Sequence, residues 1–190
     1  MDEAGLDELL HRARRRDEGA LSELVQVFSS RVYGLLYRLT GSRDAAEDLL
    51  QETFLRVVRV IDQYEHVGRF EAWLFRIAGN LARDRARKLG RRGESSLTDD
   101  VAEELVADSG RHAGASDDPA EALDRREAGA QLVAGLERLS AAEKEVILLR
   151  HYSELSFREI AAILNVPLGT ALARAHRALR RLRADLGGED

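Results

Sequence analysis

Hydrophobic residues recur every three or four positions along most of this chain, with polar residues between them. A helical segment with this spacing has one apolar face, so the pattern predicts a series of amphipathic α-helices. The longest apolar stripe is interrupted only by a threonine and comprises Ala46, Leu49, Leu50, Thr53, Phe54, Val57, Val58 and Ile61. The next stripe comprises Phe70, Trp73, Leu74, Ile77, Ala78 and Leu81. The pattern therefore predicts an all-α fold.

Three shorter helices are expected before these two long ones. Their apolar positions fall within residues 6–13, 21–28 and 32–39. Gly41 suits a helix C-terminus because glycine accepts the left-handed backbone conformation, and Ser42 can cap the helix that follows. Together these helices predict a first domain, a helical bundle over residues 1–90.

The helical spacing stops after this bundle. Residues 91–118 are rich in Gly, Ser, Asp and Ala, and only a short helical turn is indicated near residues 101–106. Such a composition is typical of a flexible linker. A helix start follows, because Asp118 can act as the N-cap, Pro119 suits the first helical position, and Glu121 lies in the first turn.

A second helical domain is predicted over residues 119–190. Three apolar stripes precede its last helix, and they fall within residues 132–139, 142–149 and 157–164. Asn165 can end the third helix in the left-handed conformation, Pro167 prevents simple continuation, and a new helix begins near Leu168. Two helices joined by such a tight turn form the helix-turn-helix pattern.

The last helix carries two stripes. One is predicted to be buried and comprises Leu168, Leu172, Ala175, Leu179, Leu182 and Leu186. The other is predicted to be exposed and comprises Thr170, Arg174, Arg177 and Arg181. Hydroxyl and guanidinium groups suit base edges and phosphates, but arginines on a terminal helix are also common as a plain solvated surface. This segment alone leaves DNA binding and a basic surface as equal alternatives.

Charge distribution favours DNA binding. The net charge of −5 is uneven, because residues 1–90 are neutral, residues 91–127 carry −6 and residues 128–190 carry +1. A second basic cluster ends the first domain and comprises Arg83, Arg85, Arg87, Lys88, Arg91 and Arg92 against the single acid Asp84. Two basic clusters on either side of an acidic linker predict contact with a polyanion at two separated places.

Several classes of function are disfavoured. The chain has no cysteine, which excludes disulfides, a thiolate nucleophile and cysteine-based zinc sites. Glu8 and His11 form the Glu-x-x-His half of a di-metal site, but no second pair exists, and no phosphate-binding loop is present. We therefore expect no enzyme activity, no cofactor and no metal. The absence of a long apolar run or a signal peptide predicts a cytoplasmic protein without membrane insertion.

Three segments together resemble a known family. They are AEDLLQETFLRVVR (46–59), FEAWLFRIAGNLARDRAR (70–87) and LSFREIAAILNVPLGTALARAHRALRRLR (155–183). In this order and spacing they closely resemble the extracytoplasmic-function (ECF) group of the sigma-70 family, which are specificity subunits of bacterial RNA polymerase. A stand-alone helix-turn-helix regulator is the alternative, but it would explain only the third segment.

The resemblance implies partners and a role for each segment. The partners would be core RNA polymerase, promoter DNA and an anti-sigma factor. Docking on core polymerase would involve Asp44, Glu47, Asp48, Gln51 and Glu52. Contact with the −10 element would involve Arg69, Asn80, Arg83 and Arg87, with Asp84 orienting a neighbouring arginine and Trp73 in the core. Recognition of the −35 element would involve Arg158, Thr170, Arg174, Arg177 and Arg181.

The third segment departs from the family pattern. Relatives commonly have a lysine and a serine soon after the Gly-Thr pair, whereas this chain has Leu172 and Ala173. The stripe count places Leu172 inward and the family match places it outward, so its orientation stays open. Either way, two polar contacts are missing, which predicts a weaker or less polar contact with the −35 element.

Overall fold

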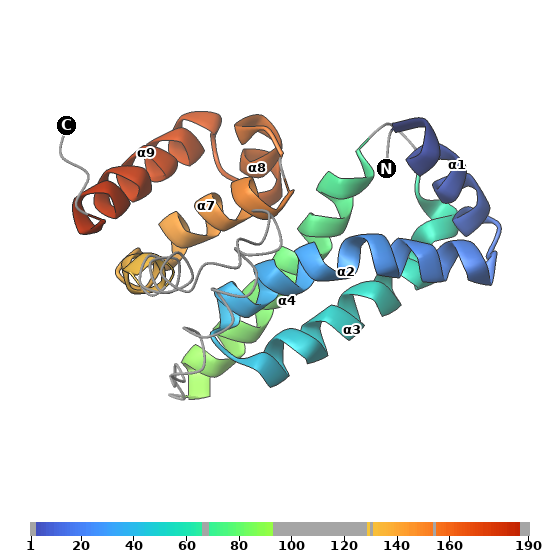
Figure 1. Cartoon of the computed structure of the whole chain (residues 1–190), viewed down its shortest axis with the longest axis horizontal. Coiled ribbons are helices and arrows are strands. Elements are labelled where there is room, and N and C mark those ends of the chain that lie inside the picture. The colour runs from blue at the N-terminus through green and yellow to red at the C-terminus, as the bar shows by residue number, and fades with distance from the viewer. Residues whose placement is uncertain (1–2, 66–68, 93–128, 130, 154, 187–190) are drawn as a thin grey trace, which may run out of the picture.

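A computed structural model describes residues 3–65, 69–92, 129, 131–153 and 155–186. Its elements are α1 (Glu3–Arg14), α2 (Glu18–Thr40), α3 (Arg43–Val60), the 3₁₀ turn η1 (Ile61–Gln63), α4 (Phe70–Arg92), α7 (Ala141–Ser153), α8 (Phe157–Leu164) and α9 (Leu168–Asp185). Residues 131–137 are also helical. The all-α prediction is confirmed (Figure 1). The expected helix start at 118–121 and nearly all of the linker lie outside the described residues.

Helix α2 corrects one expectation from the sequence. Two helices were expected over residues 21–39, but one continuous helix occupies Glu18–Thr40. Phe28 and Val32 lie four residues apart on the same face, and both are buried, so the apolar stripe continues across the polar residues between them.

The turn between α2 and α3 matches the sequence prediction. Gly41 is left-handed with a φ of 66°, and its N–H donates to the Tyr37 carbonyl over 2.8 Å. The Ser42 hydroxyl accepts from the Ala45 N–H over 3.3 Å and caps α3. These bonds satisfy backbone groups that helix ends otherwise leave unpaired.

The helix-turn-helix is also confirmed. Ser156 and Glu159 form a capping box, in which the serine hydroxyl accepts from the Glu159 N–H and the glutamate accepts from the Ser156 N–H. Asn165 ends α8 in the left-handed conformation, with a φ of 52°. Helix α9 then begins at Leu168, directly after Pro167.

The buried stripe predicted for α9 is largely wrong. Leu168, Leu172, Leu179 and Leu186 are exposed, whereas the buried residues of α9 are Ala171, Ala175, Ala178 and Leu182. Helix α9 packs against both α7 and α8. Close approach of three helices requires small side chains at the contact, so three alanines and Leu182 occupy the core face, and the other leucines lie outside it.

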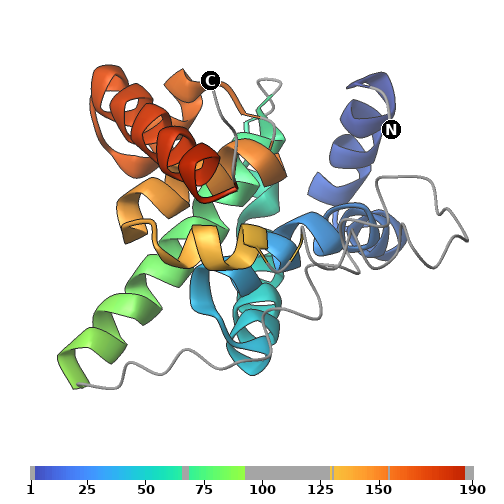
Figure 2. The same cartoon turned by 60° about the vertical axis from the view of Figure 1, so that its left-hand side comes forward.

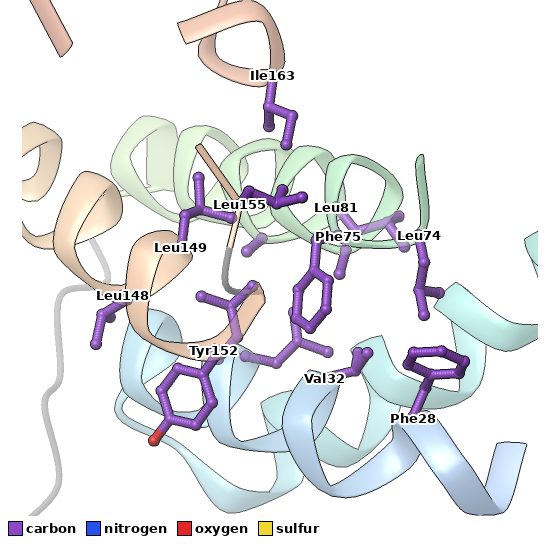
Figure 3. Packing of buried hydrophobic residues seen from close by; sticks show 14 of the residues in the cluster. Phe28, Val32, Leu74, Phe75, Leu81, Leu148, Leu149, Tyr152, Leu155 and Ile163 are labelled. Carbon is purple, nitrogen blue, oxygen red and sulfur yellow. The ribbon is translucent and has the colours of Figure 1, made fainter. Parts of the chain in front are cut away.

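The two predicted domains pack against each other. Helix α7 lies along α2 and α4, and α8 contacts α4, so α7, α8 and α9 lie at the opposite end of α2 from α1 (Figures 1 and 2). Buried side chains of both domains form one continuous hydrophobic cluster. Figure 3 shows side chains of α7, α4 and α2 in this cluster, among them Leu149, Phe75 and Val32. No helix of the described residues is both long enough and apolar enough to cross a membrane.

Candidate polymerase and nucleic-acid interfaces

An acidic row lies on the outer face of α3. Asp44, Glu47, Asp48 and Gln51 are exposed, and Glu52 is half-buried. The opposite face of the helix is buried in the bundle, and its one hydroxyl, that of Thr53, donates to the Leu49 carbonyl over 2.6 Å. Glu52 accepts from Arg56 over 2.8 Å. The carboxylates predicted to dock on polymerase are therefore held together on one rigid, solvent-facing surface.

The residues of α4 predicted to bind DNA differ in how exposed they are. Asn80 and Arg87 are exposed, and Arg87 is paired with Asp84, as expected from the sequence. Arg83 is half-buried: its guanidinium donates to Asn80 Oδ1 over 2.6 Å and to the Ile163 carbonyl of α8 over 3.2 Å. Arg83 thus contacts the second domain as well as its own helix.

An aromatic cluster supports the start of α4. Its ring-centroid distances are 4.8 Å between Tyr64 and Trp73, 5.7 Å between Tyr64 and Phe70, and 5.4 Å between Phe28 and Phe70. Trp73 is half-buried and packs against the hydrophobic core, so its predicted packing role is confirmed. Arg69, just before α4, is exposed. Residues 66–68 lie outside the described part of the chain.

On α9, two predicted DNA-contacting arginines share an ion-pair partner. Glu143 of α7 accepts from Arg177 Nε over 3.3 Å and from Arg181 Nη1 over 2.8 Å. It also accepts from the Ser140 hydroxyl over 2.7 Å and the Ser140 N–H over 3.1 Å. The Ser140 hydroxyl, followed by the Ser140 N–H and the two arginines, lowers the pKa of Glu143 although its burial opposes this.

Sequence reasoning did not identify Glu143. The signal was present, because Ser140 and Glu143 have the Ser-x-x-Glu spacing of a capping box at the start of α7. The remaining residues predicted to contact the −35 element differ in exposure: Arg158 is exposed, while Thr170 and Arg174 are half-buried. Leu172 and Ala173 are both exposed, so the outward orientation of Leu172 is confirmed.

Glu145 of α7 is a second residue that the sequence did not indicate. Its side chain is 12% exposed, and its Oε1 lies 3.0 Å from Arg83 Nε. Burial raises the pKa of Glu145, while the charges of Arg83 and Arg174 oppose that rise. One largely buried carboxylate therefore lies near a predicted −10 residue, Arg83, and a predicted −35 residue, Arg174.

The charged surfaces and the helix-turn-helix of the described residues define a class of protein. Within the described residues, no group of three or more His, Asp or Glu side chains could hold a metal ion. Glu8 and His11 are exposed on α1 rather than facing a bundle interior. An exposed acidic row on α3, a basic α4 and a helix-turn-helix together indicate a DNA-binding protein with a protein partner.

Comparison with known proteins identifies the family. The models for Sigma-70 region 2 and for Sigma-70, region 4 match residues 24–92 and 135–184. The chain is 32% identical to the ECF RNA polymerase sigma factor SigW of Bacillus subtilis, over 93% of this chain and 94% of SigW. It is 38% identical to the ECF RNA polymerase sigma factor SigE of Mycolicibacterium smegmatis, over 85% of this chain but only 59% of that protein.

A solved structure agrees with this result. The sigma factor RpoE of Bartonella quintana, crystallised with the anti-sigma factor NepR, superposes with a TM-score of 0.65 at 25% identity, covering 89% of this chain and 98% of RpoE. The chain belongs to the ECF group of the sigma-70 family. It is therefore an alternative sigma factor for RNA polymerase, not a stand-alone regulator and not an enzyme.

Proposed function

We propose that the two domains divide promoter recognition between them. The first domain (1–90) docks on core polymerase through α3 and contacts the −10 element through α4. The linker (91–118) connects it to the second domain (119–190), whose α9 contacts the −35 element. The observation that carries this proposal is the position of the acidic row of α3, which lies opposite the buried stripe and exposes Asp44, Glu47 and Asp48 to a partner.

Charge complementarity supports the docking surface. Carboxylates on a rigid helix form short charge-assisted hydrogen bonds with arginines, and such bonds are about twice as strong as neutral ones. Loss of one such bond is worth about 1.5–3 kcal/mol. Replacement of Asp48 should therefore weaken binding to core polymerase about tenfold or more.

The test compares two exposed acidic residues. Asp48→Ala removes a carboxylate from the acidic row of α3, and Glu8→Ala removes one from α1. Binding of fluorescently labelled protein to core polymerase should weaken for Asp48→Ala and remain near wild type for Glu8→Ala. Equal affinities for both variants would contradict the docking surface.

On DNA, we propose that Arg69, Asn80 and Arg87 contact the −10 strand, joined by Arg83 once it is released from the second domain. Thr170 and Arg174 lie in the N-terminal half of α9, where recognition helices contact base edges. Arg177 and Arg181 remain candidates for phosphate contacts, and their ion pairs with Glu143 fix their positions. Arg158, on the outer face of α8, is suited to the phosphate backbone.

We infer two further properties from the relatives. RpoE of Bartonella quintana was solved with an anti-sigma factor, and an anti-sigma factor is proposed as a partner of this chain too. A cytoplasmic location is proposed because the polymerase is there. Purification of a tagged chain from its own cells tests both: polymerase subunits and one small additional protein should co-purify from the soluble fraction.

A further inference from the structure

A buried carboxylate of α7 lies against the arginine face of α9. The Glu143 side chain is 4% exposed, and it accepts from Arg177 Nε over 3.3 Å and from Arg181 Nη1 over 2.8 Å. The two arginines are four residues apart, so they project from successive turns of α9 toward the same carboxylate. One acidic group thus binds two of the arginines proposed to contact DNA.

The carboxylate is held in place without help from the arginines. Glu143 Oε2 accepts from the Ser140 hydroxyl over 2.7 Å and from the Ser140 N–H over 3.1 Å, and the Glu143 N–H donates to the same hydroxyl over 3.4 Å. Such a capping box fixes a glutamate side chain at the start of its helix. Glu143 is therefore a fixed negative charge beside α9, to which the two arginine side chains are attached.

Other arginines of α9 have no such partner. Arg180 and Arg183 are exposed, and neither forms an ion pair with another residue that the structure describes. A free arginine side chain samples many rotamers, so it can follow any phosphate within its reach. Arg177 and Arg181 are 49% and 53% exposed but held in one geometry.

The contact with Glu143 leaves donors on both arginines. It uses Nε of Arg177 and Nη1 of Arg181, so Arg177 keeps two terminal nitrogens and Arg181 keeps Nε and its second terminal nitrogen. These N–H groups have a direction that is set before DNA arrives. They suit a phosphate at one position on the duplex better than phosphates at arbitrary positions.

We propose that Glu143 is a specificity-determining residue for DNA binding that acts through Arg177 and Arg181. Its charge weakens the attraction of α9 for any phosphate, which lowers non-specific affinity. DNA in the register that meets both fixed arginines binds without the entropy loss of ordering their side chains, and this offsets the weaker attraction. The proposal rests on the proposed −35 role of these two arginines.

Glu143→Gln tests the proposal, with Glu137→Gln as the matched control. Both substitutions remove one negative charge from the second domain, but Glu137 is exposed and binds neither arginine. Each chain is assembled with core RNA polymerase. The first probe is the genomic promoter fragment that gives the strongest run-off transcript with the wild-type chain. The second is the same fragment with the bases around position −35 scrambled.

Glu143→Gln should bind the scrambled fragment about threefold more tightly, because two released arginines add to the non-specific attraction. The slope of the logarithm of the binding constant against the logarithm of the salt concentration should steepen by about 0.9 for each arginine that gains a phosphate. Affinity for the intact promoter should stay nearly constant, so the ratio of the two affinities should fall about threefold. Glu137→Gln should leave this ratio unchanged.

A second comparison separates this role from a purely structural one. With Arg177→Ala and Arg181→Ala both present, Glu143→Gln should no longer change the affinity ratio. With Arg180→Ala present instead, its effect should persist in full. A structural role of Glu143 would be independent of which arginines are present, because it would act through the folding of the domain.

An unchanged affinity ratio in Glu143→Gln would overturn the proposal, and so would an effect that persists without Arg177 and Arg181. If Glu143→Gln did not fold, Ser140→Ala would decide instead. It keeps the charge but frees the carboxylate from the start of α7, so the ratio should fall, and an unchanged ratio would count against the proposal. Absence of any transcript with the wild-type chain would contradict the proposed function. The salt dependence of the free chain on a random-sequence duplex would then still test whether Glu143 restrains the arginines.

Discussion

Glu143 of α7 anchors α9 to the rest of the second domain. Its side chain is 4% exposed and accepts hydrogen bonds from Ser140, Arg177 and Arg181. Glu143→Gln preserves the shape of the side chain but removes its charge. The amide oxygen can replace Oε2, whereas the amide nitrogen then faces Arg177 Nε, so two donors meet.

The expected cost follows from these contacts. One hydrogen bond from Arg177 is lost and the ion pair with Arg181 becomes a neutral hydrogen bond. Hydrogen bonds to charged groups contribute about 1.5–3 kcal/mol. The two arginine side chains are 49% and 53% exposed, so water can solvate them once the charge is removed. We therefore expect the free energy of unfolding to fall by about 1–2 kcal/mol.

The assay is urea unfolding followed by circular dichroism, with Glu137→Gln as the control because Glu137 is exposed in the same domain.

The folded protein lowers the pKa of Glu143 below its ordinary value of 4.5, so its ionised form is favoured by folding. This stabilisation is complete above pH 4.5 and is lost as the pH falls through the lowered pKa. The difference between wild type and Glu143→Gln should therefore shrink on acidification. A difference that is the same at neutral and strongly acidic pH would refute the reasoning.

Three further predictions concern the helix ends and the recognition surface. Ser156→Ala removes the capping box of α8 and should lower stability by about 1 kcal/mol in urea unfolding, relative to exposed Ser22→Ala; equal stabilities would contradict this. Gly41→Ala places a Cβ at a φ of 66° and should cost about 1–2 kcal/mol, whereas an unchanged melting temperature would argue against the left-handed cap. Leu172→Lys adds a cation at a position that is 45% exposed, so the holoenzyme should bind promoter duplex more tightly. The slope of the logarithm of the binding constant against the logarithm of the salt concentration should become steeper by about 0.9. An unchanged affinity and an unchanged slope would refute the prediction of a weaker contact with the −35 element.

Much of the fold could be predicted from local pattern. The stripes beginning at Ala46 and Phe70 predicted α3 and α4 because their spacing matches one buried helical face. Gly41, Asn165 and Pro167 marked helix ends because each has a specific backbone preference. The acidic row of α3 was predicted as exposed because it lies off the apolar stripe, and the structure places four of its five members at the surface.

The remainder depends on contacts between distant segments. On α9, hydrophobicity alone favours burial of leucine, but the close approach of α7 and α8 selects Ala171, Ala175 and Ala178. The docking of Tyr152 on Gly34 joins residues 118 positions apart and has no signature in either segment. Glu145 carries a charge and has no special spacing, so its position near Arg83 emerges only when the two domains pack.

Run-off transcription tests the central claim most directly. Core RNA polymerase is combined with genomic promoter fragments, with and without the chain. The account predicts discrete transcripts that require the chain and weaken with Asp48→Ala. No specific initiation together with no binding to core polymerase would contradict it.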